Sequence, residues 1–228
     1  MTVELGLHAT TGYGLTEAHA LVSASPPDDP PELIARWSGR LVDGTHARVV
    51  DDAGRDVPVG QQGELLVRGF QLMDGYWDDP AATAEVIDAD GWLHTGDVAY
   101  LNADAYLKIC DRKKEMFIVG GFNVAPAEVE GLLLECDRVA ECAVVGVPDA
   151  RWGEVGAAFV VPASPGLTAA EVQAWARDHM ANYKVPHRVE LVDALPVNAT
   201  GKVVKSELRA LLAATPPAAG EPPAPAGP

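Results

Sequence analysis

The stretch Thr11–Glu17 combines a flexible backbone with groups that bind phosphate and metal. It reads TGYGLTE, and the glycines on either side of Tyr13 allow the backbone to turn sharply close to a ligand. Thr16 supplies a hydroxyl group, and Glu17 supplies a carboxylate that can approach a phosphate through a bridging Mg²⁺ ion. A strand that ends in a glycine turn would have the same residues, so this stretch alone leaves both interpretations open.

A second polar stretch, His94–Asp97 (HTGD), follows a glycine, a tryptophan and a leucine. A buried aspartate after a glycine turn can accept two hydroxyl groups of one sugar through its two carboxylate oxygens. The alternative is an Asx turn, in which the Asp97 side chain binds its own backbone.

A charged stretch, Asp111–Glu115 (DRKKE), precedes a pair of glycines at Gly120 and Gly121. Arg112 offers a rigid fork of donors that suits a ribose or a phosphate. The paired glycines allow a thin ligand to pass close to the backbone. A solvated hairpin turn with a charged tip is the alternative interpretation.

The stretch Asn198–Val203 (NATGKV) places Lys202 directly after a glycine in a predicted loop. A mobile lysine there can reach into a site and neutralise charge that develops on a phosphate. An ordinary surface lysine is the alternative. The stretch lacks the upstream glycine and the following Ser or Thr of a phosphate-binding P-loop.

The elements that must position these residues differ between the two halves of the chain. In the first half, short apolar runs broken by Gly and Asp predict antiparallel strands over His46–Val50, Glu64–Gly69 and Tyr106–Cys110. Turns are predicted at Asp51–Gly54 and Asp88–Gly91. We therefore expect a small β-rich, barrel-like subdomain over residues 36–110.

After Asp111 the pattern changes to alternating helices and strands. Glu115–Val119 is expected to be a strand that pairs with Tyr106–Cys110 across the charged turn. Pro126 is expected to open a helix, and Thr168 with Glu171 predicts a capping box. The remaining predicted elements are strands over Val139–Val147, Val155–Val161 and Arg188–Val192 and a helix over Lys205–Leu212. The second half is thus predicted to be a compact α+β domain over residues 111–212.

Composition limits the possible partners and compartment. The 228 residues carry a net charge of −16, which repels nucleic-acid phosphates and anionic membranes, so we expect no nucleic-acid partner. The three cysteines, Cys110, Cys136 and Cys142, form no Cys-x-x-Cys pair, and we expect reduced thiols in the cytoplasm rather than a disulfide or metal site. No transmembrane segment or signal peptide is visible, and the Pro- and Ala-rich residues 213–228 predict a disordered tail.

Each stretch is a weak signal alone, but their order and content together are specific. The chain resembles the acyl- and aryl-CoA synthetases of the adenylate-forming superfamily, relatives of firefly luciferase and of peptide-synthetase adenylation domains. The resemblance extends almost to the Pro-rich tail. Its blocks are TGYGLTEA (Thr11–Ala18), GELLVRG (Gly63–Gly69), GYW (Gly75–Trp77), DGWLHTGD (Asp90–Asp97), DRKKEMFIVGGFNVAPAEVE (Asp111–Glu130) and PVNATGK (Pro196–Lys202).

The resemblance implies a nucleotide site in the first half. Tyr13, with Gly14 beside it, matches the aromatic residue that stacks on adenine. Thr16 matches the hydroxyl that contacts phosphate, and Glu17 matches the carboxylate that binds Mg²⁺. Asp97 matches the aspartate that binds the ribose, and Arg112 would add to that hold.

The resemblance also implies a moving C-terminal domain. Lys114 matches the hinge about which this domain swings between two half-reactions. Gly120 and Gly121 lie in the loop that lines the pantetheine path of coenzyme A. Lys202 matches the lysine that bridges the carboxylate and the α-phosphate of ATP during adenylation, so we expect it to be catalytic.

The expected activity is ATP-dependent ligation of a carboxylic acid to coenzyme A through an acyl-adenylate, with release of AMP and pyrophosphate. The family's phosphate loop and most of its acyl pocket lie upstream of the TGYGLTE block. We therefore expect residues 1–35 to be a remnant of a large N-terminal domain, with residues up to Glu17 poorly ordered. We also expect the chain to need the missing N-terminal half for activity. The acid could be fatty, aryl or steroid-derived. A carrier protein as acceptor and a non-catalytic relic that binds a nucleotide or a partner are the alternatives.

Overall fold

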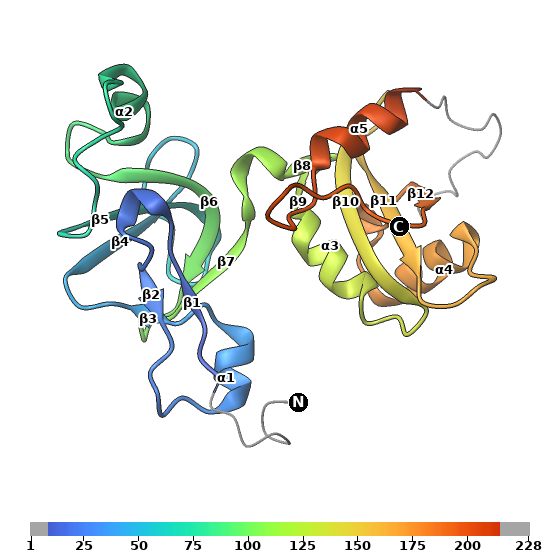
Figure 1. Ribbon diagram of the computed structural model, residues 1–228, viewed down its shortest axis with the longest axis horizontal. Helices are drawn as coiled ribbons and strands as arrows, with labels where there is room; N and C mark the ends of the chain where they lie inside the picture. The colour runs from blue at the N-terminus through green and yellow to red at the C-terminus, as the bar shows by residue number, and fades with distance from the viewer. Residues whose placement is uncertain (1–8, 215–228) are drawn as a thin grey trace. The chain divides into compact units, whose positions relative to one another are not determined.

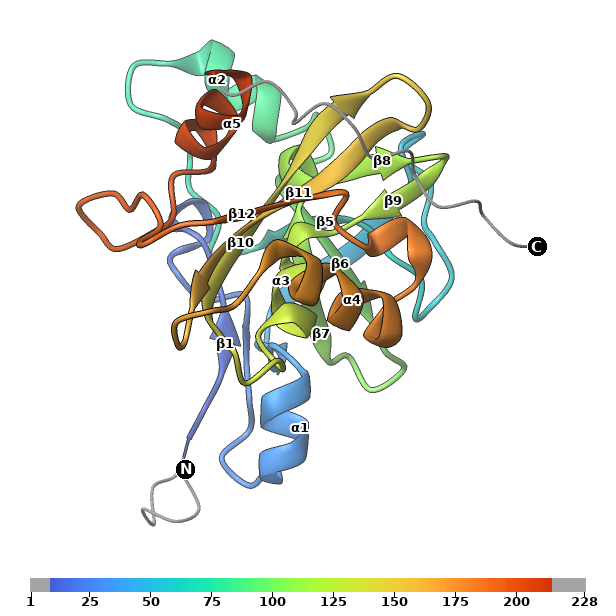
Figure 2. The same cartoon turned by 90° about the vertical axis from the view of Figure 1, so that its right-hand side faces the viewer.

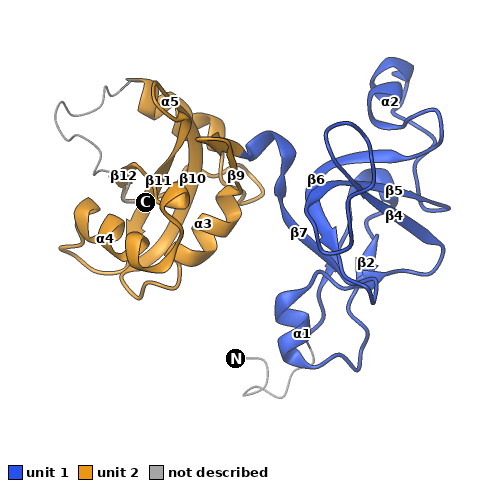
Figure 3. Cartoon of the chain, turned by 180° about the vertical axis from the view of Figure 1, so that it is seen from behind, with its two compact units in different colours: residues 1–116 blue, residues 117–228 orange. Residues whose placement is uncertain are grey.

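The computed structural model describes residues 9–214, which fall into two compact units, residues 1–116 and residues 117–228 (Figure 3). The sheets and apolar cores of each unit are formed by residues of that unit alone. The predicted tail lies outside the described residues, apart from its first two positions, which extend the last helix. The domain limits predicted from the sequence remain predictions.

The first unit contains two antiparallel sheets (Figure 1). The smaller one has the order β1-β2-β3, and the larger one has the order β4-β5-β6-β7. Its strands are β1 (Gly12–Tyr13), β2 (Ser23–Ala24), β3 (Arg40–Leu41), β4 (Thr45–Val50), β5 (Gly63–Gly69), β6 (Leu93–Leu101) and β7 (Leu107–Arg112). Its helices are α1 (Pro31–Arg36), α2 (Pro80–Val86) and the 3-10 turns η1 (Thr16–Ala18) and η2 (Lys113–Glu115).

The three strands predicted in this half are confirmed as β4, β5 and β7, and both predicted turns close with a backbone hydrogen bond from the glycine to the aspartate. The barrel-like description needs correction. Within the described residues the edge strands β4 and β7 do not pair with each other, so the four-stranded sheet is open and is not a closed barrel. In a closed barrel the first and last strands of the sheet would pair, whereas here the outer side of β7 bonds instead to Ser38 and Gly39, just before β3.

The start of the first unit is packed, contrary to the expectation of poor order for the described residues 9–17. β1 pairs with β2 in register, with Tyr13 opposite Ser23. Ala18 and Val22 are fully buried and share a core with Leu65 of β5. Tyr13 and Leu15 are partly buried against the same core, so this segment has packing partners within its own unit.

The second unit is a five-stranded sheet with helices on both faces (Figure 2). The antiparallel order is β10-β11-β8-β9, and β12 pairs with β11 in parallel. Its strands are β8 (Phe117–Val119), β9 (Phe122–Val124), β10 (Val139–Asp149), β11 (Gly153–Pro162) and β12 (Arg188–Leu191). Its helices are α3 (Pro126–Leu133), α4 (Ala169–His179), α5 (Lys205–Ala214) and the 3-10 turn η3 (Asn182–Lys184).

The alternation of side chains along β10 explains why helices pack against both faces of this sheet. Val144 belongs to the core shared with α3 and α4. Its neighbours Ala143 and Val145 point to the other face and belong to the core shared with α5. The helices predicted from Pro126, from the Thr168 capping box and over Lys205–Leu212 are confirmed, and both capping-box hydrogen bonds are present.

One predicted pairing is wrong. The segment expected as a strand over Glu115–Val119 does not pair with β7. Its charged start belongs to η2, and only β8 is extended, paired with β9 and β11. Phe117 and Val119 are 1% and 4% exposed in the core of the second unit. Because burial of these two apolar side chains is favourable, β8 pairs within the second unit's sheet. Within residues 9–214, no helix is both long and apolar enough to cross a bilayer.

Candidate functional site

A buried carboxylate lies at the centre of the first unit's polar cluster. Asp97 is on β6 and Arg112 is on β7, and the antiparallel register places their Cα atoms directly opposite each other. The Nε of Arg112 lies 2.7 Å from Oδ1 of Asp97, whose side chain is only 5% exposed. A buried carboxylate requires a partner of opposite charge, and Arg112 supplies it.

Tyr13 completes the cluster from β1. Its hydroxyl donates to Oδ2 of Asp97 at 2.5 Å, so both carboxylate oxygens are held by protein groups. Burial raises the pKa of Tyr13 well above its ordinary value, and the hydrogen bond to the Asp97 anion adds to the rise. The phenol is therefore a hydrogen-bond donor at every physiological pH.

The stretch HTGD is part of the long strand β6 rather than a turn after a strand. Gly96 adopts a left-handed φ of 68°, and the pairing of β6 with β7 shifts register between Val98 and Ala99. The Asp97 side chain does not form an Asx turn. Instead Thr95, which sequence reasoning did not single out, accepts the Asp97 amide at 3.1 Å and donates to the Leu65 carbonyl at 2.8 Å.

Glu17 forms a second polar pair with Tyr76, another residue that sequence reasoning did not assign. The Tyr76 hydroxyl donates to Oε1 of Glu17 at 2.8 Å, and this hydrogen bond raises the pKa of Tyr76. The Met73 amide donates to the Glu17 carbonyl at 2.8 Å. Tyr76 lies in the GYW block, and its place in this block is the sequence signal that could have identified it as a site residue.

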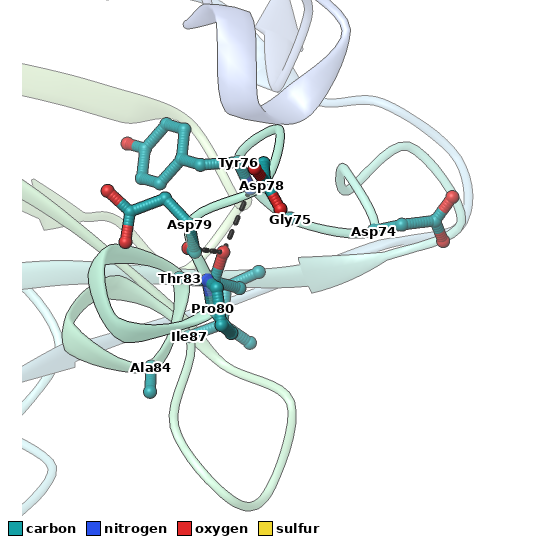
Figure 4. Close-up of a pocket in the computed structure, with 9 residues that line it drawn as sticks. All are labelled: Asp74, Gly75, Tyr76, Asp78, Asp79, Pro80, Thr83, Ala84 and Ile87. Atoms are coloured by element: carbon teal, nitrogen blue, oxygen red, sulfur yellow. Dashed lines mark hydrogen bonds between the residues drawn. The ribbon is translucent and has the colours of Figure 1, made fainter.

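Tyr76 is itself held by the start of α2. Figure 4 shows Thr83 below Tyr76, with its hydroxyl between the two backbone groups that it contacts. The Tyr76 amide donates to Oγ1 of Thr83 at 2.9 Å, and that hydroxyl donates to the Asp79 carbonyl at 2.9 Å. Asp79 also caps α2 through the Ala82 amide. These residues line a shallow open hollow that contains none of the predicted site residues.

The predicted adenine-side turn has a strict steric requirement at Gly14. A Cβ atom at this position would lie 1.8 Å from the Ala20 carbonyl oxygen, so only glycine fits. Thr16 is exposed and lies in η1 together with Glu17. The predicted residues Tyr13, Gly14, Thr16 and Glu17 are therefore placed on one short segment that is anchored at both ends by packing of Ala18 and by the β1–β2 pairing.

The residue before the predicted hinge is held by two carboxylates. Lys113 lies 3.0 Å from Glu64 and 3.1 Å from Asp52, and the hydrogen bond to Glu64 is the main reason why the pKa of Lys113 is raised. Lys114, the next residue, is exposed in η2.

The predicted coenzyme A path lies in the second unit, at the tight turn between β8 and β9. Gly120 and Gly121 have φ angles of 57° and 92°, which favour glycine. A Cβ atom on Gly120 would lie 2.9 Å from the Trp152 ring, whereas one on Gly121 would meet no atom within 4 Å. The backbone at Gly121 is thus open to a close approach.

Lys202 is exposed on a small hairpin between β12 and α5. A bridge between Val197 and Val203 closes the hairpin, and Gly201 turns it with a φ of 80°. The structure thus brings together Tyr13, Asp97 and Arg112 in the first unit, and it places Gly120, Gly121 and Lys202 in the second.

Known protein families match both halves of the chain. The family of AMP-binding enzymes matches residues 3–77, and the AMP-binding enzyme C-terminal domain matches residues 128–202. A propanoyl:CoA ligase of Rhodococcus jostii, whose acyl group carries a methyl-dioxo-octahydro-indenyl ring, is 51% identical over 92% of this chain and 39% of its own length. A feruloyl-CoA synthase of Amycolatopsis is 45% identical over 91% of this chain and 42% of its own length.

Among solved structures, the o-succinylbenzoate CoA synthetase of Bacillus subtilis in complex with its acyl-adenylate intermediate matches with a TM-score of 0.83 and 31% identity. The match covers 91% of this chain and 42% of that one. The chain therefore spans about two fifths of the length of the relatives it matches.

Proposed function

The chain belongs to the adenylate-forming family of AMP-binding enzymes, and we propose that it is the C-terminal part of an ATP-dependent carboxylic acid–CoA ligase. The reaction would convert an acid, ATP and coenzyme A to acyl-CoA, AMP and pyrophosphate through an acyl-adenylate. The buried Asp97 carboxylate, held between Arg112 and Tyr13, is the observation that supports a nucleotide site most directly. We place the protein in the cytoplasm, with no nucleic-acid partner.

In this proposal Asp97 binds the ribose hydroxyls of ATP and of the adenylate. Each carboxylate oxygen has two lone pairs, so oxygens that already accept from Arg112 and Tyr13 can each accept one further hydroxyl. The hydroxyl of Tyr13 contacts this carboxylate, and in this proposal its half-buried ring stacks on adenine. Gly14 allows the close chain approach next to it, and Thr16 offers its exposed hydroxyl to a phosphate.

The residues present also fit a Mg²⁺ ion at Glu17. Tyr76 occupies Oε1, and no residue within the described range 9–214 bonds to Oε2. Mg²⁺ is commonly held by one or two carboxylates together with substrate phosphates and waters, and a single free carboxylate oxygen suits this arrangement. When bound there, the ion would neutralise part of the charge on the phosphates. Glu17 would hold it in place.

Lys202 would act in the first half-reaction. Attack of a carboxylate on the α-phosphate of ATP brings two anions together, and a cationic ammonium group lowers that barrier electrostatically. Lys114 would serve as the hinge that exchanges Lys202 for Gly120 and Gly121 before thiol attack. The open backbone at Gly121 supports its role on the pantetheine path.

The proposal can be tested by joining this chain to the upstream part of the Amycolatopsis feruloyl-CoA synthase, which is the part that this chain does not match. Ferulate-dependent exchange of pyrophosphate into ATP is then measured for the chain alone, for the joined protein and for the complete relative as positive control. We expect exchange in the joined protein and none with the chain alone. A folded joined protein that binds ATP but shows no exchange would favour a non-catalytic binding role, and thioester formation only with a carrier protein would change the acceptor.

The acid that the natural full-length enzyme uses is a separate proposal. The relative that is 51% identical is named for a ring-substituted propanoyl group, and on that identity we propose a cyclic carboxylic acid. A long-chain-fatty-acid–CoA ligase of Salmonella typhimurium and the feruloyl-CoA synthase are both 45% identical, so a fatty acid is the competing proposal. A panel of fatty, aryl and steroid-derived acids, assayed with the natural full-length protein, decides among them. A preference for a straight-chain fatty acid would contradict this expectation.

A further inference from the structure

The hairpin that carries Lys202 repeats a turn that occurs three more times in residues 9–214. In each copy the first residue is Asp or Asn, and its side-chain oxygen accepts the amides of the third and fifth residues. The copies are Asp51–Arg55, Asp88–Trp92, Asn102–Tyr106 and Asn198–Lys202. In all four the first and fifth residues also share a backbone hydrogen bond, from the first amide to the fifth carbonyl.

Lys202 is the fifth residue of its copy, so its backbone is fixed on both sides. Its amide donates to Oδ1 of Asn198 at 2.9 Å, and its carbonyl accepts the Asn198 amide at 2.8 Å. The same Oδ1 accepts the Thr200 amide at 3.0 Å and the Thr200 hydroxyl at 2.7 Å. One side-chain oxygen therefore accepts three hydrogen bonds that hold the tip of an exposed loop.

The copy at Asp51 shows what a carboxylate does in the first position when the fifth residue is a cation. The Asp51 carboxylate accepts the turn amides through Oδ1, and its Oδ2 captures the side chain of Arg55 at 2.8 Å and 3.0 Å. That cation is neutralised by its own turn. Asn198 has a neutral amide instead, and Lys202 makes no ion pair among the described residues.

We propose that Asn198 is the positioning residue for Lys202, because its neutral oxygen fixes the lysine backbone and leaves the ammonium group unpaired. This inference rests on the proposed function, in which Lys202 acts in adenylation and not in thioester formation. An ammonium group that must meet developing charge on a phosphate benefits from a fixed base, since a misplacement of about 1 Å can cost on the order of a hundredfold in rate. It also benefits from the absence of a competing anion.

Three substitutions of Asn198 distinguish its effect on the lysine backbone from its effect on the charge of the ammonium group. Asn198→Ala removes the acceptor, Asn198→Asp keeps the acceptor but adds a carboxylate, and Asn198→Ser keeps a weaker neutral acceptor. The matched control is Asn102→Ala, which breaks the same turn between β6 and β7, where none of the proposed site residues is the fifth residue. Each variant is made in the joined protein described above. Lys202→Ala serves as the reference for complete loss.

Two half-reactions are measured with ferulate as the acid. For ATP–pyrophosphate exchange we expect a loss of about ten- to a hundredfold with Asn198→Ala and about three- to tenfold with Asn198→Asp, within the range of an exposed ion pair and added repulsion. Asn198→Ser should fall between Asn198→Ala and the unsubstituted protein. Thioester formation from supplied feruloyl-adenylate should be unchanged in all variants. Asn102→Ala should leave both half-reactions unchanged.

A readout without catalysis uses the chain itself. Amide hydrogen exchange at Thr200 and Lys202, followed by NMR, should accelerate about tenfold in Asn198→Ala and remain slow in Asn198→Asp. Normal ATP–pyrophosphate exchange in Asn198→Ala, or equal loss of both half-reactions, would overturn the inference while leaving the proposed function intact. No exchange activity in the unsubstituted joined protein would refute the proposed function and this inference with it.

Discussion

The hydroxyl of Tyr13 provides the sharpest test of the buried cluster in the first unit. Tyr13→Phe keeps the ring and removes only the group that donates to Oδ2 of Asp97. The Asp97 side chain is 5% exposed, so water cannot fully replace the lost donor. Hydrogen bonds to charged groups contribute about 1.5–3 kcal/mol, and we expect a loss of this size in the stability of the first unit.

The assay is amide hydrogen exchange followed by mass spectrometry, because it reports each unit separately. A loss of about 1.5–3 kcal/mol corresponds to roughly ten- to a hundredfold faster exchange for amides that exchange through opening of the whole unit. The acceleration should appear in peptides that cover β5, β6 and β7. Peptides from β10 and β11 provide an internal reference, because they belong to the second unit.

The matched control is Tyr100→Phe, on the same strand as Asp97. The Tyr100 hydroxyl makes no hydrogen bond to any residue between 9 and 214, so its removal should have little effect. Equal exchange rates in the two variants would refute the idea that the Tyr13 hydroxyl supports the buried carboxylate.

The difference in stability between the unsubstituted chain and Tyr13→Phe should also depend on pH. The pKa of Tyr13 is raised above its usual 10.0 in the folded chain, so the phenol ionises first in the unfolded state. The stability contributed by this hydroxyl is therefore fully present below about pH 10 and decreases as the pH rises further. Urea denaturation at pH 8 and pH 11 should show that the difference between the unsubstituted chain and Tyr13→Phe shrinks at the higher pH. A constant difference would contradict this coupling.

Three further predictions concern other parts of the chain. In the joined protein, Lys114→Pro should block rotation at the hinge and impair thioester formation while adenylation continues, and loss of adenylation instead would argue against the assigned hinge. Tyr76→Phe removes the hydrogen bond to Glu17 and should raise the Mg²⁺ concentration needed for half-maximal pyrophosphate exchange about three- to tenfold. It should also weaken Mn²⁺ binding measured by electron paramagnetic resonance. The control Tyr106→Phe, which breaks a similar hydrogen bond to Asp29, should change neither quantity. Burial raises the pKa of the Cys142 thiol to about 12, so iodoacetamide at pH 8 should modify it slowly in the folded chain and rapidly in urea, and fast modification in the folded chain would be inconsistent with that burial.

The sequence alone determined the features that depend on neighbouring residues. The Thr168–Glu171 capping box, the helix that begins at Pro126 and the turns at Asp51 and Asp88 follow from interactions within four residues, and all are confirmed. Family membership was also accessible, because it depends on the order of short motifs, and both matching family regions agree with it.

The tertiary structure decided which distant residues meet. Tyr13 reaches Asp97 across 84 positions of sequence, and Tyr76 reaches Glu17 across 59, through sheet pairings that no local pattern specifies. The strand after Lys114 joined the second sheet, because its place depends on where Phe117 and Val119 can be buried rather than on its own propensity. Side-chain burial is a property of the whole fold, so the sequence could name the chemistry of these residues but not their partners.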